Sequence, residues 1–144
     1  MSDKKLARVK WAGDMTFIGE SPSGHAVVMD SGSADGGRDH GIRPMEMLLL
    51  GMGGCASIDV ILILKKARQK VVDAWVDLDA DRREEMPRYF NKVHAKFTVV
   101  GHDLDPRHVE RAIQLSMDKY CSASAQLAAL AEITTEFEIV EAEK

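Results

Sequence analysis

The two cysteines, Cys55 and Cys121, are the residues of this sequence best suited to covalent chemistry. The thiolate is the reactive form of cysteine, and a nearby cation or a helix N-terminus favours it. If Gly53 and Gly54 interrupt the apolar segment around Cys55, this cysteine lies at a new helix N-terminus. If the helix is continuous, an arginine must supply the positive charge. The simpler alternative is that Cys55 is a small buried apolar residue, because its neighbours are apolar.

Cys121 directly precedes Ser122-Ala123-Ser124, a pattern typical of a helix start. Backbone N–H groups at such a start can stabilise an anionic sulfur. The alternative is that Cys121 only ends the preceding helix.

Three charged residues before Cys55 are candidates for assisting a thiolate. Arg38 and Arg43 carry guanidinium groups, which stay protonated and can hold a thiolate and a peroxide oxygen together. The alternative for each arginine is a solvated loop charge, which is the commoner case. Glu46 could pair with an arginine, or it could stabilise the first helical turn through the helix dipole.

The sequence gives no pattern for a metal or another cofactor. The five histidines lack the spacing of metal ligands, and the cysteines do not form a CxxC pair. We therefore expect no metal and no cofactor.

Composition predicts a globular protein that binds neither nucleic acid nor membranes. The 144 residues carry a net charge of −4, with 45% hydrophobic and 29% charged residues. The charged start has no apolar region typical of a signal peptide, so we expect a cytoplasmic protein. The apolar stretch from Met45 to Leu64 contains Glu46 and Asp59, which favours a buried core helix over a membrane span.

The pattern of elements predicts an α+β fold in one domain, residues 1–144. We expect a β-meander over 1–30, a polar loop over 31–42, a long helix over 44–70, a β-hairpin over 72–100, helices over 105–131 and a last strand over 132–140. In the first hairpin strand, alternation assigns Val72, Ala74, Val76, Leu78 and Ala80 to one face. The long helix is apolar on nearly every side, so a second subunit is implied.

Two motifs in this order make the chain similar to a known family. Residues 44–55, Pro-Met-Glu-Met-Leu-Leu-Leu-Gly-Met-Gly-Gly-Cys, resemble the first-cysteine helix of the OsmC/Ohr family. Residues 120–124, Tyr-Cys-Ser-Ala-Ser, resemble its second-cysteine motif. The likeness covers nearly the whole chain, and the Pro-Met-Glu and Gly-Gly-Cys pattern resembles a less characterised branch.

The resemblance implies an intertwined homodimer in which antiparallel sheets wrap around central long helices. It also implies a cytoplasmic thiol peroxidase of oxidative-stress defence that reduces organic hydroperoxides or hydrogen peroxide. Cys55 would be the peroxidatic residue and Cys121 the resolving residue, with a lipoyl-type or similar dithiol as the reductant. Arg38, or Arg43 in its place, would stabilise the thiolate, with Glu46 as its partner.

The first motif departs from the characterised peroxidases at one position. These have a glutamate directly after the proline, where this sequence has Met45. Glu46 follows one residue later, which is about 100° around a regular helix.

Two other functions remain open. A non-catalytic or weakly active dimer could bind a small apolar ligand near the cysteines, with Met45, Met47 and Met52 as adaptable lining or as ordinary core residues. A general disulfide-exchange protein is the third hypothesis, and the missing CxxC disfavours it.

Overall fold

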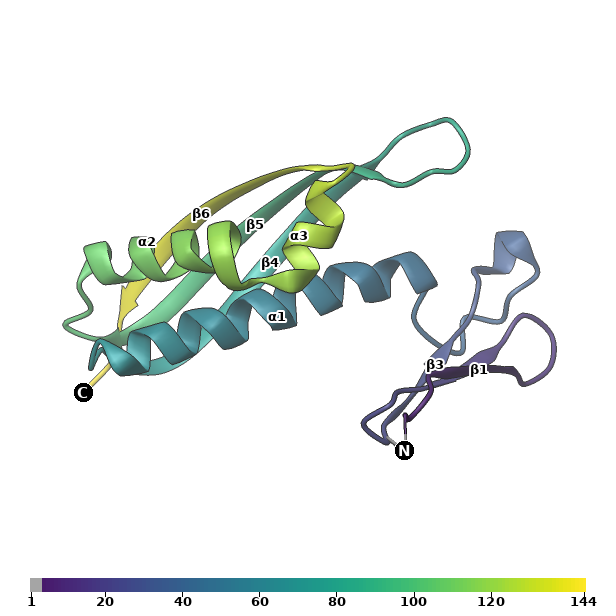
Figure 1. Cartoon of the computed structure of the whole chain (residues 1–144), viewed down its shortest axis with the longest axis horizontal. Coiled ribbons are helices and arrows are strands. Elements are labelled where there is room, and N and C mark those ends of the chain that lie inside the picture. The colour runs from purple at the N-terminus through teal and green to yellow at the C-terminus, as the bar shows by residue number, and fades with distance from the viewer. Residues whose placement is uncertain (1–3) are drawn as a thin grey trace. The chain divides into compact units, whose positions relative to one another are not determined.

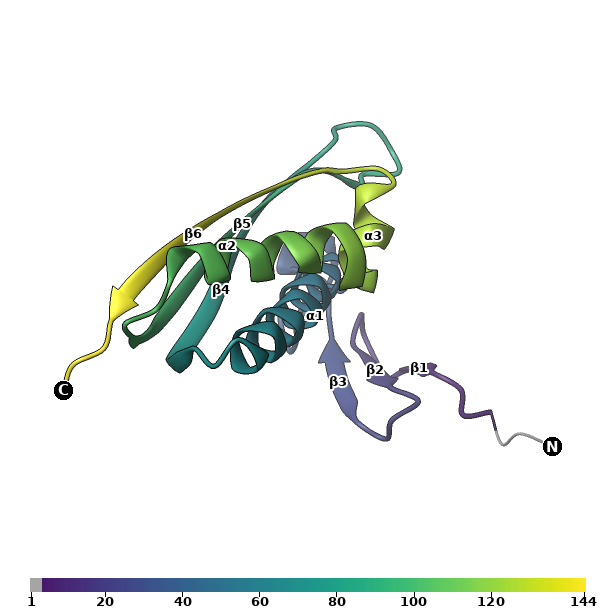
Figure 2. The same ribbon diagram turned by 60° about the vertical axis from the view of Figure 1, so that its left-hand side comes forward.

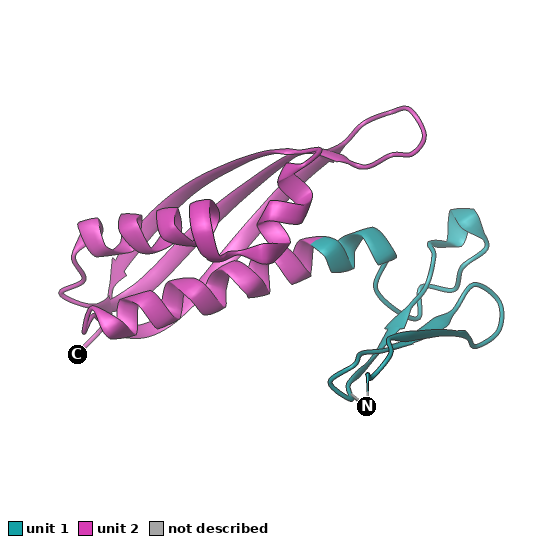
Figure 3. Ribbon diagram, in the orientation of Figure 1, with its two compact units in different colours: residues 1–48 teal, residues 49–144 magenta. Residues whose placement is uncertain are grey.

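A computed structural model describes residues 4–144 of the chain. Its element order is β1, β2, β3, η1, α1, β4, β5, α2, η2, α3, β6 (Figure 1). The chain divides into two compact units, residues 1–48 and residues 49–144 (Figure 3). The α+β class predicted from the sequence is confirmed.

The first unit contains a three-stranded antiparallel meander. Its strands are β1 (Arg8–Trp11), β2 (Phe17–Glu20) and β3 (Ala26–Met29), in the order β1-β2-β3. The turn between β1 and β2 uses Gly13 and Asp14 at positive φ, 99° and 46°, which glycine and aspartate tolerate. A short 3-10 helix, η1 (Ser33–Asp35), lies in the polar loop that follows.

The long helix α1 (Pro44–Lys66) is continuous through Gly53 and Gly54. Its first turn begins with proline, and Lys65 and Lys66 lie at its C-terminus, where positive charge complements the helix dipole. A Cβ atom on Gly53 would lie 2.8 Å from Leu78 Cδ1 of β4. This glycine therefore allows close packing of helix on strand and does not break the helix.

By length and composition alone, α1 is apolar enough to cross a membrane, with a mean hydropathy of 2.2 over its most apolar window. One face is instead packed in the protein core, where Met52, Ala56, Val60 and Leu64 are buried. Another face is apolar and open in the single chain, since Leu50, Ile58 and Leu62 are more than half exposed.

The second unit is built on a three-stranded sheet in the order β4-β5-β6. The strands are β4 (Lys70–Arg82), β5 (Phe90–His102) and β6 (Glu132–Glu141). β4 and β5 are antiparallel, but β5 and β6 are parallel, so the sheet is mixed. The expectation of antiparallel sheets is wrong for this pair, because the helical connection between β5 and β6 is long enough to return the chain in the same direction.

A bulge between Val71 and Asp73 also changes the predicted strand pattern. Val72, which alternation assigned to the same face as Ala74 and Val76, is 61% exposed. A bulge adds one residue to one strand, so the alternation shifts and Val71 takes the half-buried position. The residues from Ala74 to Ala80 follow the predicted alternation.

Helices α1 and α2 cover the same face of the sheet (Figures 1 and 2). α2 (Pro106–Leu115) begins directly after its capping residue Asp105, whose Oδ1 accepts a hydrogen bond of 2.9 Å from the Arg107 N–H. The π-helix η2 (Ser116–Tyr120) and the short helix α3 (Ser122–Ala128) follow. The core between these layers is formed by Ala56, Val60, Leu64, Ala95, Phe97, Val99, Val109, Ala112, Ile113 and Cys121.

Candidate active site

Cys55 lies in the middle of α1 and is half-buried. Because the helix is continuous, Cys55 does not begin a new helix. Of the two alternatives left open by the sequence, the one that places a helix N-terminus at Cys55 is therefore excluded.

Cys121 lies where η2 ends and α3 begins, and its side chain is 3% exposed. Its N–H donates a 2.7 Å hydrogen bond to the Ser116 carbonyl, five residues earlier, as in a π-helix. Its sulfur takes the capping position of α3 and accepts hydrogen bonds from the Ser124 N–H (3.3 Å) and the Ser124 hydroxyl (2.9 Å). The sequence correctly marked this position as a helix start.

The fold brings the sulfurs of the two cysteines together and adds a carboxylate. Cys55 Sγ, Cys121 Sγ and an Asp59 carboxylate oxygen all lie within 4.8 Å of one another. Asp59 follows Cys55 by four residues, so the two share one face of α1. The Ser116 hydroxyl donates a 2.9 Å hydrogen bond to Asp59 Oδ2.

Sequence reasoning missed Asp59 as a site residue and used it only as an argument against a membrane span. The available signal was its spacing of four from Cys55, which places both side chains on one side of a helix. This spacing alone does not show that Cys121 completes the group, because that contact depends on how α3 packs against α1.

The environment of Cys121 favours its protonated form. Burial raises the pKa of the Cys121 thiol, and the hydrogen bonds from Ser124 lower it by less. The neighbouring Cys55 sulfur raises it further through hydrogen bonding and charge. The Cys121 thiol therefore keeps its proton to higher pH than an ordinary cysteine. Cys55 is the more accessible of the two sulfurs.

The predicted arginines are engaged in ion pairs within the first unit. Arg38 Nε lies 2.8 Å from Asp14 Oδ2, and Arg43 Nη1 lies 2.8 Å from Asp39 Oδ1. Glu46 Oε1 accepts a 2.8 Å hydrogen bond from the backbone N–H of Arg43. The Glu46 side chain thus caps the first turn of α1 by binding a backbone N–H group.

The loop that carries Arg38 is organised by the buried carboxylate of Asp30. Asp30 Oδ2 accepts hydrogen bonds from the Thr16 hydroxyl (3.0 Å) and from the N–H groups of His40 (3.0 Å) and Arg38 (3.4 Å). The Ser31 N–H bonds to Asp30 Oδ1 at 2.8 Å. The polar loop over 31–42 thus has a fixed internal anchor.

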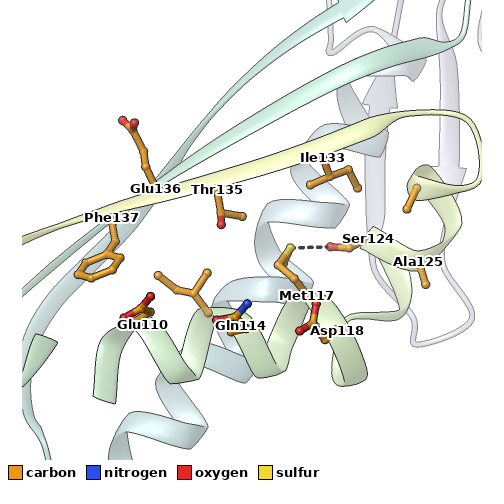
Figure 4. A pocket seen from close by; sticks show the side chains of 12 residues that line it. Glu110, Gln114, Met117, Asp118, Ser124, Ala125, Ile133, Thr135, Glu136 and Phe137 are labelled. Atoms are coloured by element: carbon orange, nitrogen blue, oxygen red, sulfur yellow. Dashed lines mark hydrogen bonds between the residues drawn. The ribbon is translucent and has the colours of Figure 1, made fainter. Parts of the chain in front are cut away.

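A separate groove of about 640 Å³ lies between β6 and the helical segment from α2 to α3 (Figure 4). Neither cysteine lines it, but Ser124 does, and its hydroxyl also contacts Met117 Sδ at 3.6 Å and the Cys121 sulfur. The groove is lined by Glu110, Ile113, Gln114, Met117, Asp118, Ser124, Ala125, Ala128, Ile133, Thr135, Glu136 and Phe137. Met52, one of the methionines considered for an apolar pocket, is fully buried as a core residue.

A sequence model of the OsmC-like protein family matches residues 36–136, which include both cysteines and Asp59. The chain belongs to the OsmC-like protein family. Protein YhfA of Escherichia coli strain K12, a relative in this comparison, is 48% identical over 136 residues, covering 94% of this chain and 98% of YhfA.

Solved structures agree with this OsmC-like assignment. The crystal structure of a hypothetical protein from Aquifex aeolicus is 29% identical and has a TM-score of 0.84, covering 99% of this chain and 100% of that one. The organic hydroperoxide resistance protein OhrB of Bacillus subtilis has a TM-score of 0.61 at 15% identity, covering 92% and 98% of the two chains. At that identity the likeness to OhrB shows the OsmC-like fold alone.

Proposed function

We propose that this OsmC-like protein is a thiol-dependent peroxidase that reduces organic hydroperoxides, and hydrogen peroxide as a smaller substrate, in oxidative-stress defence. The observation that carries the proposal is the approach of the Cys55 and Cys121 sulfurs to within 4.8 Å. A disulfide has a sulfur–sulfur bond of about 2.05 Å, so the two sulfurs must move closer together for the bond to form. The fold shared with OhrB makes organic hydroperoxides the first substrates to test.

The reaction begins at Cys55, the more accessible sulfur. Its thiolate attacks one peroxide oxygen, the O–O bond breaks, and the alcohol leaves after taking up a proton. Sulfur is oxidised by two electrons to a sulfenic acid, and the peroxide is reduced. The Cys121 sulfur then displaces water from the sulfenic acid, which forms the Cys55–Cys121 disulfide. A lipoyl-type or similar dithiol restores both thiols and becomes a disulfide itself.

The assignment of roles is supported by the different environments of the two sulfurs. Burial raises the pKa of Cys121, so this residue stays a thiol while Cys55 reacts. Cys121 is then adjacent to the sulfenic acid when it forms. Its thiol gives up its proton as the sulfur attacks, because the thiolate is the nucleophile, and that proton leaves with the sulfenic hydroxyl as water.

Positive charge for the Cys55 thiolate would come from Arg38, or from Arg43 in its place. The support is the family resemblance together with the position of both residues just before α1. Either guanidinium must exchange its ion pair with Asp14 or Asp39 to act on a thiolate or peroxide. Arg38→Ala and Arg43→Ala decide between them, because only replacement of the assisting arginine should slow the oxidation of Cys55. Glu46→Gln tests whether the carboxylate contributes beyond the first turn of α1.

We also propose that the protein acts as a homodimer. The support is the exposed apolar face of α1, where Leu50, Ile58 and Leu62 are 63%, 63% and 52% exposed in the single chain. Contiguous apolar faces of this kind typically mark an interface. A reducing compartment such as the cytoplasm suits the proposed cycle, because the reduced dithiol is the form that reacts.

Thiol counting tests the peroxidase. Reduced protein is mixed with one equivalent of cumene hydroperoxide per chain, and free thiols are titrated over time. We expect both thiols to disappear together in the wild type. In Cys55→Ser we expect the one remaining thiol, Cys121, not to react promptly. In Cys121→Ser we expect one thiol to be lost as a sulfenic acid that dimedone traps. Two intact thiols in the wild type after long exposure would rule the peroxidase out.

A second function, binding of a small apolar ligand, is favoured by the groove beside β6. Ile113, Met117, Ile133 and Phe137 give it an apolar lining, and Ser124 connects it to the Cys121 sulfur. A fluorescent apolar probe should bind the wild type and bind more weakly to Ile133→Glu if this function is correct. Probe binding without any thiol oxidation would favour the binding protein over the enzyme.

A further inference from the structure

We infer that Cys55, Asp59 and Cys121 form a binding site for a thiophilic divalent cation of the Zn²⁺ class. The inference uses the same reduced sulfurs as the proposed peroxidase, but it requires no peroxidase activity. It also departs from the expectation from sequence that the chain holds no metal site, because the three ligands meet only in the folded protein.

The distances fit a small ion with sulfur and oxygen ligands. Zn²⁺ binds cysteine sulfur at about 2.3 Å and carboxylate oxygen at about 2.0–2.2 Å, which places tetrahedral ligand atoms roughly 3.5–3.8 Å apart. The three atoms here all lie within 4.8 Å of one another. Contraction by roughly 1 Å would therefore complete the coordination.

The three ligands are held from two different parts of the fold. Cys55 and Asp59 lie one turn apart on α1, a spacing that presents both side chains to one point. Cys121 comes from the junction of η2 and α3. Three protein ligands leave the fourth position of a tetrahedral ion for water, as in open zinc sites.

Hydrogen bonds behind the ligands orient them for binding. The Ser116 hydroxyl donates a 2.9 Å hydrogen bond to Asp59 Oδ2, which orients the carboxylate, and the other oxygen, Oδ1, would bind the ion. The N–H and hydroxyl of Ser124 point at the Cys121 sulfur. Such outer partners fix ligand orientation in metal sites and are worth roughly 10–100-fold in affinity.

Charge and ligand softness favour the same class of ion. Asp59 takes part in no ion pair among residues 4–144, so its charge has no cationic side chain to balance it. Two thiolates select Zn²⁺ and similar ions over Mg²⁺ and Ca²⁺, which prefer oxygen ligands. Each thiol that binds the ion releases its proton, so one bound ion displaces up to two protons.

Metal binding and peroxide reduction would exclude each other. An ion bound to both sulfurs occupies the electron pairs that attack a peroxide, and a disulfide removes both metal ligands. We therefore expect Zn²⁺ to protect the thiols from oxidation, and a chelator to restore their reactivity.

Cobalt spectroscopy tests the site. Reduced, chelator-treated protein is titrated with Co²⁺ under anaerobic conditions, which keep the thiols reduced. The assay uses no peroxide, so it does not depend on peroxidase activity. We expect one equivalent per chain to give a near-ultraviolet sulfur-to-cobalt band and the visible bands of a tetrahedral ion, both lost when Zn²⁺ is added. The disulfide form of the same chain should give neither band. Absence of the bands in the reduced wild type would overturn the inference.

Substitutions test the contribution of each ligand to Co²⁺ binding. Asp59→Asn should weaken Co²⁺ binding by roughly tenfold or more, and Ser116→Ala by about tenfold. Each of Cys55→Ser and Cys121→Ser should abolish the one-equivalent binding. Asp118→Asn is the matched control, because Asp118 is an exposed aspartate close to Cys121 in sequence but outside the group. It should bind like the wild type.

Circular dichroism spectra identical to that of the wild type are required of every variant, so that lost binding is not unfolding. Wild-type affinity in Asp59→Asn would overturn the three-ligand site. The experiments can contradict either proposal without the other. Binding of Co²⁺ without reaction with hydroperoxide would contradict only the peroxidase. Reaction with hydroperoxide without a cobalt band would contradict only the metal site.

Discussion

Asp59 and Ser116 are joined by a 2.9 Å hydrogen bond that connects the middle of α1 to the start of η2. Ser116 is fully buried, and its carbonyl also accepts the N–H of Cys121. The bond therefore links the position of the Asp59 carboxylate to the segment that places the second sulfur.

Removing this bond should destabilise the protein. Ser116→Ala leaves a half-buried carboxylate without its donor, and hydrogen bonds to charged groups contribute about 1.5–3 kcal/mol. We expect a loss of that order in the free energy of unfolding, measured by urea denaturation of the reduced protein. Ser122→Ala, at an exposed position nearby, should change it by less than about 0.5 kcal/mol. Equal effects of the two substitutions would contradict a structural role for the bond.

The stability of the reduced protein should fall in alkaline solution because of Cys121. Burial raises the pKa of this thiol above its ordinary value of 9.0. Between the ordinary and the raised pKa the folded state binds more protons than the unfolded state, so the free energy of unfolding decreases as pH rises. The contribution is complete below the ordinary pKa and is lost as pH passes through the folded-state value.

Urea unfolding at several pH values above 8 measures this effect. The wild type should lose stability more steeply with pH than Cys121→Ser, whose hydroxyl does not titrate in this range. Parallel curves for the two proteins would show that the buried thiol does not contribute. A reductant must be present throughout, so that a disulfide does not form.

A charge on the open face of α1 should separate the proposed dimer. Ile58 is 63% exposed in the single chain, so Ile58→Glu does not disturb the core of one subunit. In a dimer that buries this face, the same glutamate would be desolvated without a partner, which is strongly unfavourable. We expect wild-type dimers and folded Ile58→Glu monomers by light scattering.

The control for this experiment is Met86→Glu, which changes an 81% exposed apolar residue between β4 and β5. It should leave the dimer intact. A wild-type protein that scatters as a folded monomer would remove both the dimer and the argument that α1 needs a partner.

Asp30 should stabilise the first unit only while it is ionised. Burial acts to raise the pKa of Asp30, but hydrogen bonds from His40, Thr16, Ser31 and Arg38 outweigh it and lower the pKa below 3.8. The stabilisation is therefore present above that value and is lost as pH falls through the lower pKa of the folded state.

Asp30→Asn tests this by replacing an acceptor with a group that also donates. We expect the loop over 31–42 to exchange its amide protons faster in Asp30→Asn at neutral pH. The difference from the wild type should shrink in acid, where Asp30 itself becomes protonated. Asp35→Asn, on the same loop but exposed, is the matched control. A difference that persists unchanged in acid would contradict the pKa argument.

Local features of the fold could be predicted from the sequence alone. The alternating strands, the Asp105-Pro106 helix start and the helix start after Cys121 depend on neighbours within a few residues. Glycines at 53 and 54 were ambiguous, because helix propensity cannot distinguish a break from close packing. The contact between Gly53 and Leu78 resolves this, and it joins residues on different elements.

The sequence by itself determined the family and the α+β class, and it predicted the two sulfurs as the reactive groups, because these follow from residue types and short spacings. Only the tertiary structure decided that Asp59 joins the sulfurs, that β6 runs parallel to β5 and that Val72 turns outward. Each of these depends on the register and packing of elements that are distant in sequence. Such contacts are fixed by the fit of whole surfaces in the core, which no local pattern encodes.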